Sequence, residues 1–231
     1  MSGPKIAVLD YGIGNLRSAE KALQHVGAAA RLVTDPAEVE AADAVVLPGV
    51  GAFGACARAL RESGLEKVAR AAIAGDVPFL AVCIGFQLLY EGSDENTEGA
   101  GEGGVGEGVG EGADESGLGI FPGRVTALAP TVKHPQMQWN QLVPVGAETE
   151  AGAEIEAGSL RGLGPRPWVY FVHSFAPPVG AETVAVCEYG GPVAALVERG
   201  NLWGAQFHPE KSGTTGLTLL ANFVHLAEEA A

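Results

Sequence analysis

The sequence predicts an α/β fold, with a mostly parallel open sheet, helices on both faces and an antiparallel extension toward the C-terminus. Short apolar runs alternate with helical segments over the first half, which is typical of parallel strands covered on both faces. The second half contains strand-like segments joined by tight glycine turns. The chain has 231 residues, of which 47% are hydrophobic, and this is ample for the core of one domain.

The first half is expected to alternate strands and helices. Asp35-Pro36 opens a short helix, because Asp is a good N-cap and Pro suits the first helical position. A longer helical region is broken near Ser63-Gly64. The expected strands are residues 6–9, 30–33, 44–47 and 77–82, and the other expected helices are residues 16–26, about 52–75 and 86–90.

The second half is expected to form antiparallel strands followed by one helix. Gly190-Gly191 and Gly200-Asn201 are tight-turn dipeptides between apolar runs, which favours antiparallel pairing. The expected strands are residues 168–172, 183–186, 193–197 and 202–207, and residues 217–229 are expected to form an amphipathic helix.

Residues 91–115 interrupt this pattern with an acidic, low-complexity Gly/Glu tract. It holds nine of the 28 acidic residues and no Lys or Arg. Such a segment cannot bury enough apolar surface to offset its chain entropy. Its acidic side chains would repel phosphate, which argues against a phosphate-binding loop. We therefore expect a flexible loop inserted into a single domain that spans residues 1–231.

Composition also bears on several classes of function. No basic patch stands out in a chain of net charge −14, so we expect no nucleic-acid partner. No apolar run is long enough for a membrane span, and the N-terminus reads as a strand rather than a signal peptide. Three cysteines without an export signal indicate a reducing cytoplasm. Scattered histidines predict no metal site. The Asp10–Ser18 segment fails the dinucleotide fingerprint because Arg17 holds its third glycine position, so no NAD or FAD is expected.

Cys83 lies where the fourth expected strand meets a helix. Ala81 precedes it by two residues and Gly85 follows it by two, so small residues flank a sharp turn. This is the thiol version of a nucleophile elbow, and the helix N-terminus beside it favours a thiolate. The other two cysteines, Cys56 and Cys187, are interpreted as small buried hydrophobes.

A base for this thiol is predicted at His208, which follows the last expected strand. Pro209 biases His208 toward an extended backbone, in which residues two apart point the same way. Glu210 can then orient the imidazole as the third member of a nucleophile–base–orienter triad. On this motif alone, a surface or hydrogen-bonded core histidine is the more common outcome.

A glycine-rich loop, Pro48-Gly49-Val50-Gly51, follows the third expected strand. Its glycines permit unusual backbone angles and expose N–H groups. Adjacent parallel strands end at the same edge of a sheet, so this loop can supply oxyanion donors beside Cys83. A plain turn between strand and helix is the alternative interpretation.

Together these motifs resemble those of the class I (triad) glutamine amidotransferases, over nearly the whole chain outside the acidic tract. Cys83-x-Gly85-x-Gln87 and the distant His208-Pro-Glu210 carry the resemblance. A further combination resembles the glutaminase subunits of imidazole glycerol phosphate synthases, which act in histidine biosynthesis. It consists of Asp10-Tyr-Gly-x-Gly-Asn-Leu-x-Ser18, Pro48-Gly-Val-Gly-Ala-Phe53, Tyr170-Phe-Val-His-Ser174 and Phe207-His-Pro-Glu-Lys-Ser212.

The resemblance implies a mechanism that needs no cofactor. Cys83 attacks the side-chain amide of glutamine, His208 passes the proton to the departing ammonia, and Glu210 supports the imidazole. The implied oxyanion donors and glutamine contacts are Ile84, the Gly49–Gly51 loop with Val50, Gln87, His173 and Ser174. For His173, ordering the pocket through hydrogen bonds is nearly as good an interpretation as direct contact.

The resemblance also implies a heterodimer with a (βα)8-barrel cyclase, which receives the ammonia through an internal channel. The residues carried over to that interface are Asn15, Trp139, Asn140 and Lys211. A solvated surface lysine is the alternative for Lys211. Gln138 stands where the family usually has Gly, which bears on the local turn expected at Trp139 and Asn140.

Three other functions stay open at this point. The chain could be another class I amidotransferase subunit, such as the anthranilate or pyridoxal phosphate type, or a γ-glutamyl hydrolase. A third possibility is a non-catalytic binding subunit with a vestigial triad. The intact Cys83, His208 and Glu210 argue against this last function.

Overall fold

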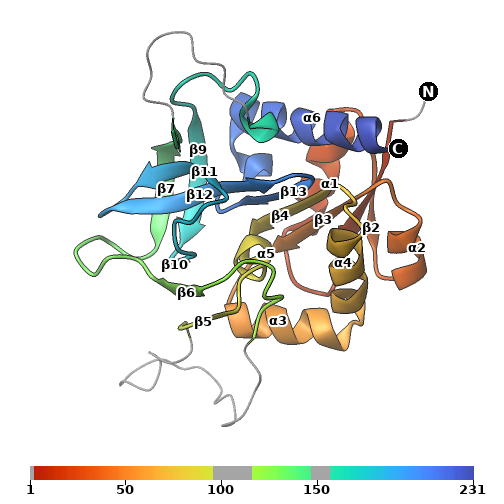
Figure 1. The fold of residues 1–231 in the computed structure, drawn as a ribbon, viewed down its shortest axis with the longest axis horizontal. Helices are drawn as coiled ribbons and strands as arrows, with labels where there is room; N and C mark the ends of the chain where they lie inside the picture. The colour runs from red at the N-terminus through yellow and green to blue at the C-terminus, as the bar shows by residue number, and fades with distance from the viewer. Residues whose placement is uncertain (1–2, 96–115, 147–156) are drawn as a thin grey trace.

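The computed structural model describes residues 3–95, 116–146 and 157–231 (Figure 1). Within them the main sheet has the strand order β2-β1-β3-β4-β13-β12-β11-β8. The parallel strands are β1 (Lys5–Leu9), β2 (Ala29–Val33), β3 (Ala44–Gly49), β4 (Phe79–Cys83) and β13 (Leu202–Ala205). The antiparallel strands are β12 (Pro192–Arg199), β11 (Thr183–Glu188) and β8 (Val143–Pro144). The predicted fold class, parallel with an antiparallel extension, is confirmed.

Helices cover both faces of this sheet. Helices α1 (Leu16–His25) and α6 (Gly213–Ala230) pack together on one face, and α2 (Pro36–Glu40), α3 (Phe53–Glu62) and α4 (Leu65–Ala74) lie on the other (Figure 1). Strands β3 and β4 are therefore buried along their whole length. Each fully buried aliphatic or aromatic side chain there stabilises the fold by about 1.5–3 kcal/mol. The core therefore lies next to the carboxyl ends of β3 and β4, and Cys83 is the last residue of β4.

Local sequence signals set the helix boundaries as expected. The Asp35 carboxylate accepts from the Ala37 N–H at 2.9 Å and caps α2. Gly64, with φ of 75°, separates α3 from α4 in a left-handed conformation that glycine tolerates. The last helix begins at Gly213, four residues before the prediction. Gly216 reads as a helix breaker, but a Cβ there would lie 1.9 Å from the Pro209 carbonyl oxygen, so the close approach requires glycine.

A two-stranded ribbon beside the main sheet was not predicted. It pairs β7 (Gln136–Gln141) with β9 (Trp168–His173) in antiparallel register, so the strand predicted at 168–172 exists but lies outside the main sheet. The turn expected at Trp139 and Asn140 is wrong, because both residues lie within β7. Gln138 pairs with Phe171 in regular strand geometry, which suits a residue with a Cβ and does not need glycine.

The remaining small sheet contains β5 (Gly92–Ser93), β6 (Arg124–Ala127) and β10 (Phe175–Ala176). Strand β5 lies near the start of the acidic tract, so Gly92 and Ser93 belong to a strand. Residues 96–115 of that tract lie outside the described residues, so the prediction of a flexible loop is not addressed. Its two ends are adjacent, since Gly92 and Ser116 form an isolated antiparallel bridge. Among the described residues, no helix combines the length and apolar character needed to cross a bilayer.

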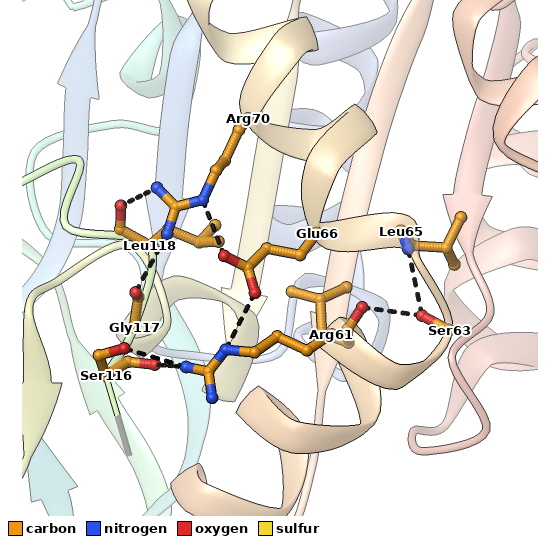
Figure 2. A network of polar contacts seen from close by, with 9 residues as sticks. Arg61, Ser63, Leu65, Glu66, Arg70, Ser116, Gly117 and Leu118 are labelled. Atoms are coloured by element: carbon orange, nitrogen blue, oxygen red, sulfur yellow. Dashed lines mark hydrogen bonds and ion pairs between the residues drawn. The ribbon is translucent and has the colours of Figure 1, made fainter. Parts of the chain in front are cut away.

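An ion-pair network fixes the C-terminal end of that tract to helices α3 and α4 (Figure 2). Glu66 binds Arg61 at 3.1 Å and Arg70 at 2.8 Å. The Arg61 guanidinium also donates to the Ser116 hydroxyl at 3.0 Å and to its carbonyl. Arg70 donates to the carbonyl oxygens of residues 117 and 118. Both ends of residues 96–115 are therefore anchored to the folded domain.

Candidate active site

Cys83 forms a strained turn between β4 and the short helix α5 (Ile84–Gln87). Its backbone has φ of 56° and ψ of −113°, a region that non-glycine residues rarely occupy. A Cβ at Gly85 would lie 2.0 Å from the Leu47 carbonyl oxygen, so only glycine lets α5 pack this closely on β3. The thiol is consequently held at the carboxyl edge of the sheet, where open α/β sites lie.

His208 and Glu210 form a buried pair. The His208 Nδ1 lies 2.9 Å from the Glu210 Oε1, and both side chains are almost fully buried. His208 has the extended backbone expected before proline. The expectation of extended chain as far as Glu210 is wrong, because residues 209–211 form a 3-10 turn, η2 (Pro209–Lys211). That turn brings the carboxylate back onto the imidazole.

The electrostatics of this pair favour a charged imidazole. Burial by itself lowers the pKa of His208. Hydrogen bonding with Cys83 and Glu210, and the charges on those two residues, outweigh burial and raise the pKa to about 10. His208 is therefore an imidazolium near neutral pH. The charged imidazole lines the same cavity as Cys83, and cysteine is nucleophilic as its thiolate. The Nε2 of His208 makes no hydrogen bond of acceptable geometry with a described residue.

A cavity of about 280 Å³ brings together most of the residues predicted from the sequence. Eight of the predicted residues line it: Val50, Gly51, Cys83, Ile84, Gln87, His173, Ser174 and His208. They come from the ends of β3 and β4, from α5, from the end of β9 and from the segment after β13. Parallel neighbouring strands explain the first group, and the unpredicted ribbon explains why His173 and Ser174 face the same cavity.

The glycine-rich loop lies directly beside the elbow. Gly49 is the register partner of Cys83. A Cβ at Gly49 would lie 2.7 Å from the Gly85 nitrogen and 2.9 Å from the Tyr11 hydroxyl, so the loop is seated against the elbow. Gly51 has φ of 92°, which favours glycine. The backbone of this loop is thus close enough to the thiol to act on a substrate bound there.

Gln87 lines this cavity, and hydrogen bonds to its neighbours fix its side-chain amide. Its Nε2 donates to the Phe175 carbonyl at 2.9 Å and to the Gln206 Oε1 at 3.1 Å. Since the Phe175 carbonyl can only accept, it determines the amide orientation, and the Gln87 Oε1 has no hydrogen-bond partner among the described residues. Gln206, which is buried, was not singled out from the sequence, because its role depends on contact with a residue far away in the chain.

His173 presents a second acceptor. Its Nδ1 lies 2.9 Å from the Phe175 carbonyl, which can only accept, so Nδ1 carries the proton. Burial lowers the pKa of His173 to about 4, with the backbone bond opposing this and the charge on His208 adding to it. The imidazole is therefore neutral near pH 7. The Nδ1 bond orders the pocket, as one of the two interpretations of His173 expects, and its Nε2 is an acceptor with no described partner.

Two further residues of the site were missed. Glu95 lines the cavity, and its carboxylate accepts from the Phe53 N–H at 2.5 Å. In the sequence Glu95 belongs to the acidic low-complexity tract, so no motif marks it as a site residue. Cys56 is buried as expected, but its thiol also donates to the Val50 carbonyl at 3.2 Å. The sequence signal available for Cys56 was its position, about one turn into the helix that follows the glycine-rich loop.

The four residues predicted for a partner interface lie outside this cavity. Asn15 lines a small hollow together with His208 and Glu210. Trp139 is half exposed, with its ring 6.1 Å from that of Tyr170. Asn140 turns its amide toward the Glu188 carbonyl, 3.0 Å away, and Lys211 is exposed on η2.

The fold and this site match a known family. Residues 7–227 match the model described as glutamine amidotransferase class-I, so the chain is a class I glutamine amidotransferase. A solved structure titled crystal structure of glutamine amidotransferase aligns with a TM-score of 0.65 and 21% identity, over 96% of this chain and 98% of the other. PurLQS from Thermotoga maritima aligns with a TM-score of 0.67 and 17% identity, over 96% and 98% of the two chains. These structural matches support the fold alone.

Sequence relatives narrow the family further. The chain is 44% identical to imidazole glycerol phosphate synthase subunit HisH of Thermosynechococcus vestitus, over 99% of this chain and 100% of the relative. It is 41% identical to the subunit HisH of Deinococcus radiodurans, over 96% and 94% of the two chains. The Bacillus cereus subunit HisH is 39% identical over 96% and 95%. The chain therefore belongs, within the class I enzymes, to the HisH subunit family.

Proposed function

We propose that this protein is the glutamine amidotransferase subunit of an imidazole glycerol phosphate synthase in histidine biosynthesis. The observation that carries the proposal is that His208, held by the buried Glu210, lines the same cavity as Cys83 in a chain of the HisH family. The overall reaction converts glutamine and water to glutamate and ammonia. The reducing cytoplasm is the compartment in which the Cys83 thiol would stay available.

In the first half-reaction the Cys83 thiolate attacks the carboxamide carbon of glutamine. The carbonyl electron pair moves onto oxygen, and the tetrahedral intermediate collapses when His208 donates its proton to the leaving ammonia. In the second half-reaction His208 takes a proton from water, and the water oxygen attacks the γ-glutamyl thioester. Glutamate is released, and the Cys83 thiolate and the protonated His208 are restored. Glu210 holds the imidazole by its Nδ1 throughout.

Backbone N–H groups complete this site. Ile84 follows Cys83 at the start of α5, and the Gly49–Gly51 loop, with Val50, lies opposite. We propose that these supply the oxyanion donors. Loss of one such donor typically costs about 10²–10³ in rate.

Other residues that line this cavity suit the α-amino end of a glutamine molecule. The Gln87 Oε1, the His173 Nε2 and the Glu95 carboxylate are hydrogen-bond acceptors contributed by residues of one cavity. An α-ammonium group is a compact donor of three hydrogen bonds and would be recognised by them. Ser174, next to His173, lines the same cavity, and we propose that its backbone contacts the substrate.

We propose that the partner is a (βα)8-barrel cyclase in a heterodimer. Asn15, Trp139, Asn140 and Lys211 are the proposed contacts. Trp139 supports this because large aromatic side chains that are half exposed are enriched at interfaces. We also infer that residues 1–231 form one amidotransferase domain with an insertion at 91–115.

The test measures glutamine hydrolysis by the protein alone, with the barrel cyclase, and with the cyclase plus its nucleotide substrate. Low activity alone and strong stimulation in the last mixture are expected. In the control mixtures, synthase subunits of other glutamine-dependent pathways replace the barrel cyclase. No stimulation in any mixture would exclude the subunit assignment, and stimulation by an anthranilate or pyridoxal phosphate synthase would reassign it. Cys83→Ala should abolish hydrolysis without preventing folding.

The interface is tested separately by titrating the cyclase. Trp139→Ala should weaken the complex by roughly tenfold or more, because truncation of a buried aromatic anchor costs on the order of 2 kcal/mol. Val179→Ala is the control, since Val179 is also an exposed apolar residue but lies on neither η2 nor β7. Equal affinity of both variants and the wild type would remove Trp139 from the interface.

A further inference from the structure

Two buried side chains donate hydrogen bonds to backbone carbonyl groups of the glycine-rich loop. The Tyr11 hydroxyl donates to the Pro48 carbonyl at 2.6 Å, and the Cys56 thiol donates to the Val50 carbonyl at 3.2 Å. Tyr11 follows β1, whereas Cys56 lies in α3, and both are buried. Neither is part of the mechanism described above.

Both groups stay protonated over the working pH range. Burial raises the pKa of Tyr11 well above its ordinary value, with smaller contributions from Cys56 and Cys83. Burial also raises the pKa of Cys56 to about 11, although its hydrogen bonds to Tyr11 and Val50 act in the opposite direction. Each group is therefore a neutral O–H or S–H donor near pH 7, and Cys56 is a poor nucleophile.

These bonds determine the orientation of the loop backbone. A carbonyl oxygen and the following N–H belong to one planar peptide group, so a fixed carbonyl also fixes that N–H. Tyr11 thereby orients the N–H of Gly49, and Cys56 orients the N–H of Gly51. The Tyr11 hydroxyl would also lie 2.9 Å from a Cβ at Gly49, so it contacts the loop on the side where the elbow helix packs.

We propose that Tyr11 and Cys56 are positioning residues that hold the oxyanion-donor loop in register with Cys83. This inference rests on the proposed function, in which that loop stabilises the oxyanion. Hydrogen-bond donors contribute most when they are already aimed at the charge that develops. Loosening the loop would then slow the chemical step and leave binding of intact glutamine nearly unchanged.

The experiment compares Cys56→Ala with Cys56→Ser in the complex with cyclase and nucleotide. Alanine removes the donor, and serine replaces it with a hydroxyl. Cys187→Ala is the matched control, because Cys187 is equally buried and hydrogen-bonded but contacts Gln136 instead of the loop. The readouts are kcat, KM and the affinity for glutamate γ-semialdehyde. The Cys83 sulfur adds to its aldehyde carbon, and the aldehyde oxygen takes up the C=O electron pair at the oxyanion position.

We expect Cys56→Ala to lower kcat about fivefold to tenfold with KM within twofold, as loss of one hydrogen bond implies. Affinity for the semialdehyde should fall by a similar factor. Cys56→Ser should recover most of both losses, and Cys187→Ala should match the wild type. Tyr11→Phe should show the same loss of kcat as Cys56→Ala.

Other outcomes would overturn the inference. These are an unchanged kcat in both Cys56→Ala and Tyr11→Phe, a rise in KM alone, a rise in kcat, or equal losses in the alanine and serine variants with no change in semialdehyde affinity. A wild-type complex that does not hydrolyse glutamine would instead refute the proposed function. Urea unfolding of each variant separates a kinetic effect from loss of the fold.

Discussion

At the scale of single residues, the site depends on two histidines, of which one is protonated and the other neutral near pH 7. The pKa of His208 is raised to about 10, and that of His173 is lowered to about 4. Both are buried, so the difference comes from their partners. His208 faces a thiol and a carboxylate, whereas His173 bonds to a neutral backbone carbonyl. One ring can therefore carry a proton to a leaving group while the other stays an acceptor.

The first prediction concerns Glu210→Gln. Removing the carboxylate removes a charge that raises the pKa of His208, so that pKa should fall and the imidazolium should be lost at lower pH. Stimulated kcat should drop about 10²–10³-fold, and the alkaline limb of its pH profile should move to lower pH. Steady-state glutaminase rates between pH 6 and 10 would measure both. A reduced kcat with an unmoved alkaline limb would contradict the electrostatic role.

The second prediction concerns stability in acid. The pKa of His173 is about 4 in the folded chain and near 6.5 when unfolded, so below pH 6.5 the unfolded state binds the proton more tightly. The free energy of unfolding should therefore fall by about 3 kcal/mol from this group as pH drops from 7 to 4. Urea unfolding would show this loss in the wild type. His173→Asn, which keeps an N–H for the Phe175 carbonyl, should lack it, and a parallel loss in both proteins would contradict the assignment.

At the scale of elements, the close approach of α5 to β3 sets the elbow. Gly85→Ala would place a Cβ 2.0 Å from the Leu47 carbonyl, a backbone atom that cannot move without displacing β3. We expect a destabilisation of more than about 2 kcal/mol. Gly180→Ala is the control, because its Cβ would lie 3.8 Å from the nearest atom, and its effect should be within about 0.5 kcal/mol. Similar unfolding midpoints for the two variants would argue against the tight packing.

Elements with a local sequence signal could be predicted, and those defined by distant pairing could not. The Asp35 cap, the Gly64 break and the apolar parallel strands are each set by residues next to them in the chain. Strand β7 has only a weak local signal: Met137 and Trp139 alternate with polar residues, but both side chains are exposed, so no buried face marks the strand. Its conformation comes from pairing with β9, about thirty residues away.

At the scale of the whole molecule, the site combines segments from both halves of the chain. The thiol, the base and the orienter could be predicted because each lies in a motif with a mechanism. Glu95 and Gln206 could not, because they act through contacts with Phe53 and Gln87 that only the folded chain creates. The turn at η2, which returns Glu210 to His208, likewise depends on the tertiary arrangement.

The fourth prediction concerns the acidic tract as a part of that whole. The Gly92–Ser116 bridge and the network of Arg61, Glu66 and Arg70 hold its two ends together (Figure 2). Replacing residues 99–113 with a short Gly/Ser linker should leave kcat and KM of the cyclase complex within about twofold, because loop length changes closure entropy only slowly. Loss of activity in this variant, with Glu95 retained, would show that the tract contributes to catalysis.

The backbone of Cys83 also limits how this scaffold can evolve. With φ of 56°, the position tolerates side chains with a single heavy atom on Cβ, whereas β-branched residues meet severe steric conflict there. Cysteine and serine fit this requirement, and threonine does not. Nucleophile replacement during divergence is thus confined to unbranched side chains, so a threonine hydrolase is not reachable from this elbow by one substitution.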